Sequence, residues 1–181
     1  MYALGMVEVL SIPMGVLAGD AMLKAAQVTL VSAQAVCAGK YVVLISGEVA
    51  AVKASVEAGV NAAENTLVDS LVIPNIDARV IAAISGVSEI EYVQAVGVME
   101  SFSLTAAILA ADAAVKAAEV ELLEVRLGRG MGGKSFVVLS GEVAAAEAAV
   151  AAAINSESTE GMLSRSVVIP SPHSDIISAL L

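Results

Sequence analysis

The sequence has few of the residues on which most catalytic and metal sites depend. Among its 181 residues there is one cysteine, Cys37, and one histidine, His173. A single cysteine cannot form a disulfide within the chain, and this usage is typical of a reducing cytoplasm. The lone histidine has no second histidine or cysteine near it in the sequence, so one chain offers no cluster of metal ligands. No Ser-His-Asp or Cys-His arrangement emerges. We therefore expect no enzyme active site, and we expect His173 to lie in solvent or at an interface.

Basic residues are scarce as well. The chain has 9 lysines and arginines against 19 aspartates and glutamates, a formal net charge of −10. Nucleic-acid binding depends on lysine and arginine neutralising phosphates, and docking on an anionic membrane needs the same charges. The composition therefore argues against a nucleic acid and against a membrane surface as partner.

Long uncharged runs are missing, although the chain is 58% hydrophobic and its mean hydropathy is +0.86. A membrane-spanning helix needs roughly 18 or more apolar residues in succession. The longest stretch without a charge is the 15 residues between Lys24 and Lys40. No basic segment precedes an apolar run at the start. We expect neither a membrane span nor secretion, and we expect the apolar residues to be buried in helix packing and in large interfaces.

A repeated segment is the most informative feature that is present. Ala-Leu-Gly-Met-Val-Glu at 3–8 returns as Ala-Val-Gly-Val-Met-Glu at 95–100, 92 positions later. Ser-Gly-Glu-Val-Ala at 46–50 recurs unchanged at 140–144, and the Val-Ile-Pro at 72–74 recurs at 168–170. A period this long indicates duplication of a whole domain. The sequence predicts two copies of one domain, at 1–91 and 92–181.

Each copy is expected to have the order β-α-β-β-α-β followed by a short helix. In the first copy the strands are predicted at 4–9, 28–36, 41–45 and 67–73, and the short helix at 79–84. This order predicts an α+β fold in which helices pack on an antiparallel sheet.

Two local features of the helices can be predicted from the first copy. Ser46 is expected to be the N-cap of the second helix, because its hydroxyl could accept a hydrogen bond from the first turn. A helical period predicts the buried face of the first helix. The residues on that face are Met14, Leu17, Ala18, Ala21 and Ala25.

Residues 128–135 satisfy the phosphate-binding P-loop pattern G-x-x-x-x-G-K-[ST] letter for letter. That motif binds phosphate because a helix N-terminus follows the glycines. Here residues 136–139 form an apolar β-type run, and no helix is expected before about Gly141. The corresponding turn of the first copy lacks the pattern. We interpret the segment as a glycine-rich loop near a symmetry axis or a neighbouring chain, with a nucleotide-binding enzyme as the alternative.

Several segments resemble the shell domain of bacterial microcompartments. They are the strand at 3–8, Asp-Ala-Met-Leu-Lys-Ala-Ala at 20–26, Gly-Glu-Val-Ala-Ala-Val-Lys-Ala at 47–54 and Val-Ile-Pro at 72–74, matched in the same order by the second copy. The resemblance implies a tandem-domain shell protein, whose trimers mimic hexamers and tile with other shell proteins around enclosed enzymes. It implies a location in the shell of this polyhedral organelle within the cytoplasm.

The same resemblance places the turn between the second and third strands of each copy at a central pore. The residues concerned are Val36, Cys37, Ala38, Gly39, Gly128, Arg129, Gly130, Met131, Gly132 and Gly133. The first turn is similar to that of tandem shell proteins of the propanediol-utilisation type, in which a cysteine at this place holds an iron–sulfur cluster.

A threefold axis would bring three copies of the Cys37 thiolate together, enough for three irons of a [4Fe–4S] cluster, with water or a small ligand on the fourth. Ala38 and Gly39 would then lie beside the cluster, which would pass electrons between enclosed redox enzymes and the cytosol. The alternatives are an open, metal-free pore that conducts small metabolites, and a trimer that senses a small molecule.

Two lysines match the lysine that packs at the tile edge in this family. They are Lys24 and Lys116. Many relatives also carry an arginine after the last strand, where this chain has Asn75 and Ser171. This departure predicts weaker tiling of the protein with itself.

Overall fold

The computed structural model describes residues 2–86 and 93–180. The chain forms two compact units, Met1–Ile76 and Asp77–Leu181. The boundary predicted between the two sequence copies, at 91/92, lies outside the described residues. None of the described helices is long and apolar enough to cross a membrane.

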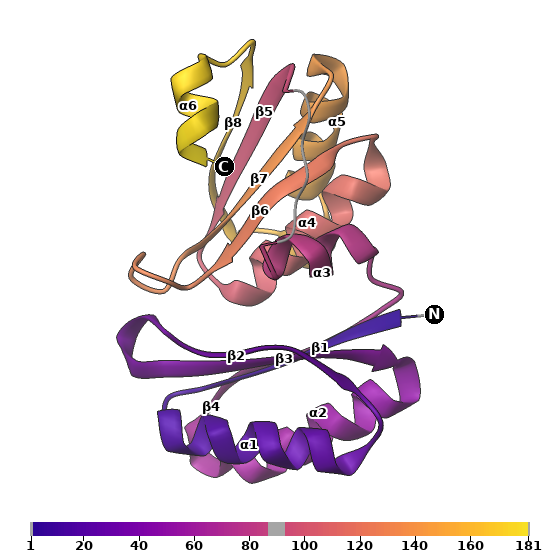
Figure 1. The fold of residues 1–181 in the computed structure, drawn as a ribbon, viewed down its shortest axis with the longest axis vertical. Helices are drawn as coiled ribbons and strands as arrows, with labels where there is room; N and C mark the ends of the chain where they lie inside the picture. Colours follow the sequence, from indigo (N-terminus) through magenta and orange to yellow (C-terminus); the bar gives the residue numbers. More distant parts are fainter. Residues whose placement is uncertain (1, 87–92, 181) are drawn as a thin grey trace. The chain divides into compact units, whose positions relative to one another are not determined.

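The first unit is a four-stranded antiparallel sheet with two helices on one face (Figure 1). The strand order across the sheet is β2-β3-β1-β4. The elements in chain order are β1 (Tyr2–Val9), α1 (Ile12–Ala25), β2 (Thr29–Val36), β3 (Lys40–Glu48), α2 (Val49–Ala63) and β4 (Leu67–Pro74), with 3₁₀ turns at Cys37–Gly39 and Glu64–Thr66.

The second unit repeats this order, with one short helix before it and one after it. Its sheet has the order β6-β7-β5-β8 and is again antiparallel (Figure 1). The elements are α3 (Ala78–Ile84), β5 (Ala95–Ser101), α4 (Leu104–Ala117), β6 (Glu121–Leu127), β7 (Ser135–Gly141), α5 (Val143–Ile154), a 3₁₀ turn at Glu157–Thr159, β8 (Leu163–Pro170) and α6 (Ser174–Leu180). The predicted α+β class and the order of elements are confirmed.

The buried face of α1 only partly matches the one predicted. Gly15, Ala18, Gly19 and Met22 face the core, whereas Leu17 is 49% exposed. A Cβ atom on Gly15 would lie 2.5 Å from the side chain of Tyr41 on β3. Of the predicted residues, Ala18 is buried as expected. The prediction was wrong at Leu17 because the apolar period passed over Gly15 and Gly19, which have no side chain and let the helix backbone approach the sheet. The Leu17 side of α1 is left at the surface.

The predicted N-cap at Ser46 is also wrong. Ser46 is buried inside β3, where it is opposite Leu4 on one neighbouring strand and Thr29 on the other. Because β3 is paired on both sides, the ladder keeps Ser46 extended. The helix α2 begins only at Val49, and its N-cap Glu48 makes no side-chain capping bond.

Each sheet is packed with apolar side chains. The core of the first unit lies between the sheet and its helices, and it includes Val7, Met22, Val43, Ile45 and Val52. In the second unit a further cluster of Val96, Leu123 and Val138 is contacted by Leu180 of α6. Val96 lies next to Gly97, which faces Val150 of α5. Because side chains alternate along a strand, α6 touches the sheet on the face opposite α5.

Candidate functional site

The hairpin between β2 and β3 carries the only cysteine of the chain. Cys37 opens the turn and is partly buried. Ala38 and Gly39 follow with φ angles of 61° and 73°, in the left-handed region. Successive backbone N–H groups in a turn of this kind form a concavity that binds anions, including the sulfurs of iron–sulfur sites. The turn therefore suits a thiolate that carries a bound metal.

An ion pair joins this hairpin to the sheet. The Nζ of Lys40, directly after the turn, donates to Oε1 of Glu8 on β1 at 2.9 Å. Glu8 is opposite Val42, so Lys40 is its diagonal neighbour on the same face of the sheet. The side chains are 21% and 4% exposed, respectively. This pair, in which the glutamate is buried and the lysine partly exposed, joins the base of the Cys37 hairpin to β1.

The second hairpin has no cysteine and contains the P-loop pattern. Four of its glycines have positive φ: Gly128, Gly130, Gly132 and Gly133. The predicted strand after the motif is confirmed, because β7 begins at Ser135. The Ser135 hydroxyl accepts the backbone N–H of Gly128 at 3.2 Å and so closes the hairpin.

The lysine of that pattern is engaged in an ion pair as well. Lys134 donates to Oε1 of Glu100 at 2.8 Å, which repeats the Lys40–Glu8 pair in the second copy. The Ser164 hydroxyl donates to the same carboxylate. The hydrogen bond from Lys134 is the main cause that holds the pKa of Glu100 below its ordinary value, and that from Ser164 is the second. The lysine and the serine hydroxyl of the pattern are thus bonded within the fold.

One chain supplies one sulfur to the candidate site. Within residues 2–86 and 93–180 no group of three histidine, cysteine or acidic side chains is placed to hold a metal ion. The two hairpins belong to different compact units. The pore-lining role of Val36 and of residues 128–132 stays a prediction.

The two lysines predicted at the tile edge occupy the last turns of equivalent helices. Lys24 and Lys116 each donate to an aspartate four residues earlier at 2.6 Å. Lys24 has a side chain that is 74% exposed, against 43% for Lys116. Their role at a tile edge stays a prediction.

A network in the second unit was not predicted. Arg79 of α3 donates to the backbone carbonyls of Val115 and Val120 at 2.9 and 2.8 Å, and to both carboxylate oxygens of Asp77. The hydrogen bond from Arg79 is the main cause that holds the pKa of Asp77 below its ordinary value. The only sequence signal for it is a difference between the copies, since His173 and Asp175 stand at the equivalent positions.

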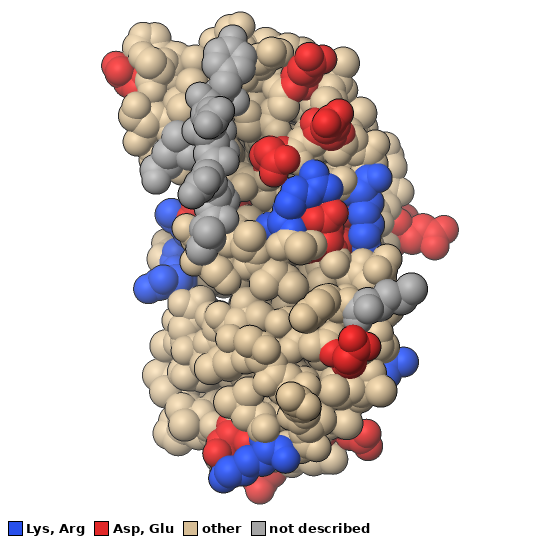
Figure 2. Space-filling model, turned by 45° about the vertical axis from the view of Figure 1, so that its right-hand side comes forward, with Lys and Arg blue, Asp and Glu red and all other residues tan. Residues whose placement is uncertain are grey.

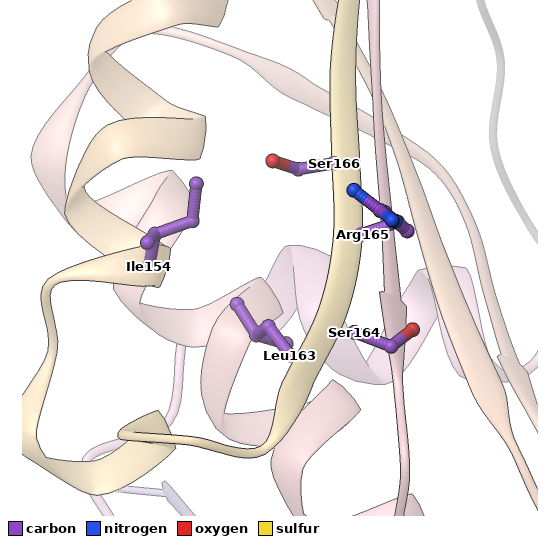
Figure 3. Close-up of a pocket in the computed structure, with 5 residues that line it drawn as sticks. All are labelled: Ile154, Leu163, Ser164, Arg165 and Ser166. Atoms are coloured by element: carbon purple, nitrogen blue, oxygen red, sulfur yellow. The ribbon is translucent and has the colours of Figure 1, made fainter.

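A hollow of about 270 Å³ lies between the end of α5 and β8. Ile154 borders it from the helix, and Leu163 and Ser166 point towards it from the strand (Figure 3). Its lining contains no acidic side chain or histidine, so it offers no acid–base pair. On the face drawn in Figure 2, some basic and acidic side chains lie side by side, other acidic side chains lie alone, and broad uncharged areas separate them.

Two copies of a four-stranded antiparallel sheet with helices on one face, joined in one chain, define a tandem-domain protein. The family model of the BMC domain matches residues 3–76 and 95–172. The chain therefore belongs to the BMC domain family, that of bacterial microcompartment shell proteins, and it contains two copies of the domain.

Relatives of both the tandem and the single-copy type support this assignment. The chain is 44% identical to the bacterial microcompartment shell protein PduT of Citrobacter freundii, over 94% of this chain and 93% of that protein. It is 39% identical to the carboxysome shell protein CcmK2 of Synechococcus elongatus over 52% of this chain and 92% of that protein. The crystal structure of a microcompartment protein from Desulfitobacterium hafniense matches with a TM-score of 0.95 and 49% identity, covering 98% and 99% of the two chains.

Proposed function

We propose that three copies of this chain form a trimeric tile of a microcompartment shell, and that the three Cys37 hairpins surround its axis and hold one [4Fe–4S] cluster. The observation that carries the proposal is a cysteine at the tip of a left-handed hairpin turn in a tandem BMC chain. Six domains in three chains would give the tile pseudo-sixfold symmetry, because each chain already contains two equivalent copies.

The donor set and the backbone around Cys37 fit such a cluster. Cysteine thiolate is the usual ligand of iron–sulfur clusters, and four thiolates are the usual number. Three chains would supply three, and a water or small ligand would complete the fourth iron. The N–H groups that follow Cys37 would stabilise the negative sulfurs. The part-buried Lys40–Glu8 pair would keep each hairpin in position.

When bound, the cluster would supply one-electron transfer across the shell. The protein would then have a structural and electron-carrying role with no catalytic site of its own. Its partners would be other shell proteins at the tile edges, through Lys24 and Lys116, and enclosed redox enzymes.

The proposal is tested by anaerobic purification and reconstitution with iron and sulfide. We expect a brown protein with four irons for every three chains, about 1.3 irons per chain. Cys37→Ala should lose the iron and the colour while the trimer persists. Met131→Ala, at the tip of the other hairpin, is the matched control and should retain both.

Two results would contradict the cluster. One is a trimer that stays colourless and free of iron after reconstitution, which would favour an open pore for metabolites. The other is iron that remains bound in Cys37→Ala. A chain that is monomeric at all concentrations would contradict the tile itself.

A further inference from the structure

The segment Asp77–Ile84, which contains α3, has a well-defined seat in the second unit. The backbone N–H of Asp77 donates to Oδ1 of Asp112 on α4 at 2.9 Å. Arg79 then caps the end of α4 and the loop after it through the carbonyls of Val115 and Val120. The helix α3 packs against α4 and β6. We call the surface formed by Asp112, Val115 and Leu122 the covered seat.

The first unit contains the same seat without a cover. Asp20, Leu23 and Leu30 stand 92 positions before the three residues of the covered seat, on α1 and β2. Leu23 and Leu30 are 40% and 45% exposed. Their counterparts Val115 and Leu122 are 4% and 3% exposed. We call this surface the open seat. Among the residues that the structure describes, the Asp20 carboxylate is bonded only to Lys24.

The chain also contains a second segment, around α6, that corresponds in sequence to the segment covering the covered seat. His173, Asp175 and Ile176 stand 96 positions after Asp77, Arg79 and Val80. Val80 is 0% exposed in the second unit, whereas Ile176 on α6 is 51% exposed. No residue of α6 is buried. In the part of the chain that the structure describes, the open seat and the exposed segment around α6 therefore both remain uncovered. They correspond in sequence to the covered seat and to the segment around α3 that covers it.

We propose that the segment 173–180 of one copy of this chain occupies the open seat of a second copy, with the backbone N–H of His173 bonded to Asp20. The contact is heterologous, because it joins two different surfaces of the chain. Repeated from chain to chain, it closes a ring of three when each chain is rotated by a third of a turn from the last. This inference rests on the proposed trimer and names the contact that closes it.

The charges of the segment 173–180 and of the open seat are complementary. The same residues nevertheless make this contact between chains weaker than the contact at the covered seat. Asp175 would replace Arg79 and would lie near Lys24, the counterpart of Lys116. A carboxylate cannot donate to the carbonyls of Leu23 and Val28, which correspond to the two that Arg79 binds. The junction between chains therefore lacks the guanidinium bonds present within one chain.

The test measures trimer dissociation of the full chain by sedimentation equilibrium, with circular dichroism as a check of folding. Asp20→Ala and Ile176→Asp should each raise the dissociation constant about tenfold or more, because each removes a central contact. Glu57→Ala, an exposed acidic position on α2, is the control and should change nothing. The double variant His173→Asp/Asp175→Arg recreates the Asp77–Arg79 pair and should tighten the trimer by about tenfold.

The outcomes separate this inference from the proposed trimer. If the wild type is trimeric and Asp20→Ala, Ile176→Asp and the double variant all behave like Glu57→Ala, the seat is wrong and the trimer stands. If the wild type is monomeric throughout, both are wrong. Weakening by the first two variants together with tightening by the double variant supports the seat.

Discussion

Replacing Lys40 with methionine should destabilise the first unit far more than the equivalent Lys134→Met destabilises the second. Methionine retains much of the apolar stem and removes the charged Nζ. In the first copy this leaves the carboxylate of Glu8, whose side chain is 4% exposed, without the cation bonded at 2.9 Å. Removing one partner of a buried ion pair typically costs about 3–5 kcal/mol.

The second copy supplies the matched comparison. Glu100 has a side chain that is 41% exposed, and it keeps the hydrogen bond from Ser164 when Lys134 is lost. An exposed ion pair is worth about 0–1 kcal/mol. The two substitutions make the same chemical change at equivalent positions of the two copies, so the expected difference of about 3 kcal/mol reflects the burial of Glu8 and the hydrogen bond that Glu100 keeps from Ser164.

Hydrogen exchange followed by mass spectrometry can measure the two units separately, through peptides from β3 and β7. We expect faster exchange in β3 for Lys40→Met and little change in β7 for Lys134→Met. Adding Glu8→Gln to Lys40→Met should restore part of the loss, because it removes the unpaired buried charge. Equal losses in the two single variants, or a loss below about 1 kcal/mol for Lys40→Met, would refute the reasoning.

Three further predictions concern the stability of each unit by itself. Arg79→Ala should lower the free energy of unfolding by about 1.5–3 kcal/mol in urea titrations, because two carbonyls and Asp77 lose a charged donor; a loss below about 0.5 kcal/mol would count against this network. The pKa values of Asp77 and Glu100 are lower in the folded protein than in the unfolded chain, where they are near 4. The two carboxylates should therefore stabilise the fold above about pH 4, and this stabilisation should be lost as the pH falls through their folded pKa values. Thermal unfolding from about pH 6 to pH 2 should therefore show a smaller acid loss in Asp77→Asn, and identical slopes would contradict it. Gly15→Ala should cost about 1–3 kcal/mol in urea, because its Cβ would lie 2.5 Å from Tyr41, and unchanged stability would show that α1 moves away freely.

Local patterns and the repeat were enough to predict much of this molecule from its sequence. The duplication predicted two copies with the same order of strands and helices, because similar sequences favour similar secondary structure. Apolar runs rich in β-favouring residues predicted the strands, and the run at 136–139 also predicted that β7, instead of a helix, follows the glycines at 128–133. Cys37 was singled out by its place in a turn that resembles a known family, and the structure adds that Ala38 and Gly39 are left-handed there.

Contacts between residues far apart in the chain were decided only by the tertiary structure. The buried side of α1 is set by how closely β3 lets a helix approach, which favours Gly15 over Leu17. Ser46 stays in a strand because two neighbouring strands pair with it. Two lysine–glutamate pairs that look alike in the sequence differ about tenfold in the exposure of the glutamate side chain, 4% against 41%. Burial is a property of everything that surrounds a residue, and the sequence near that residue does not contain it.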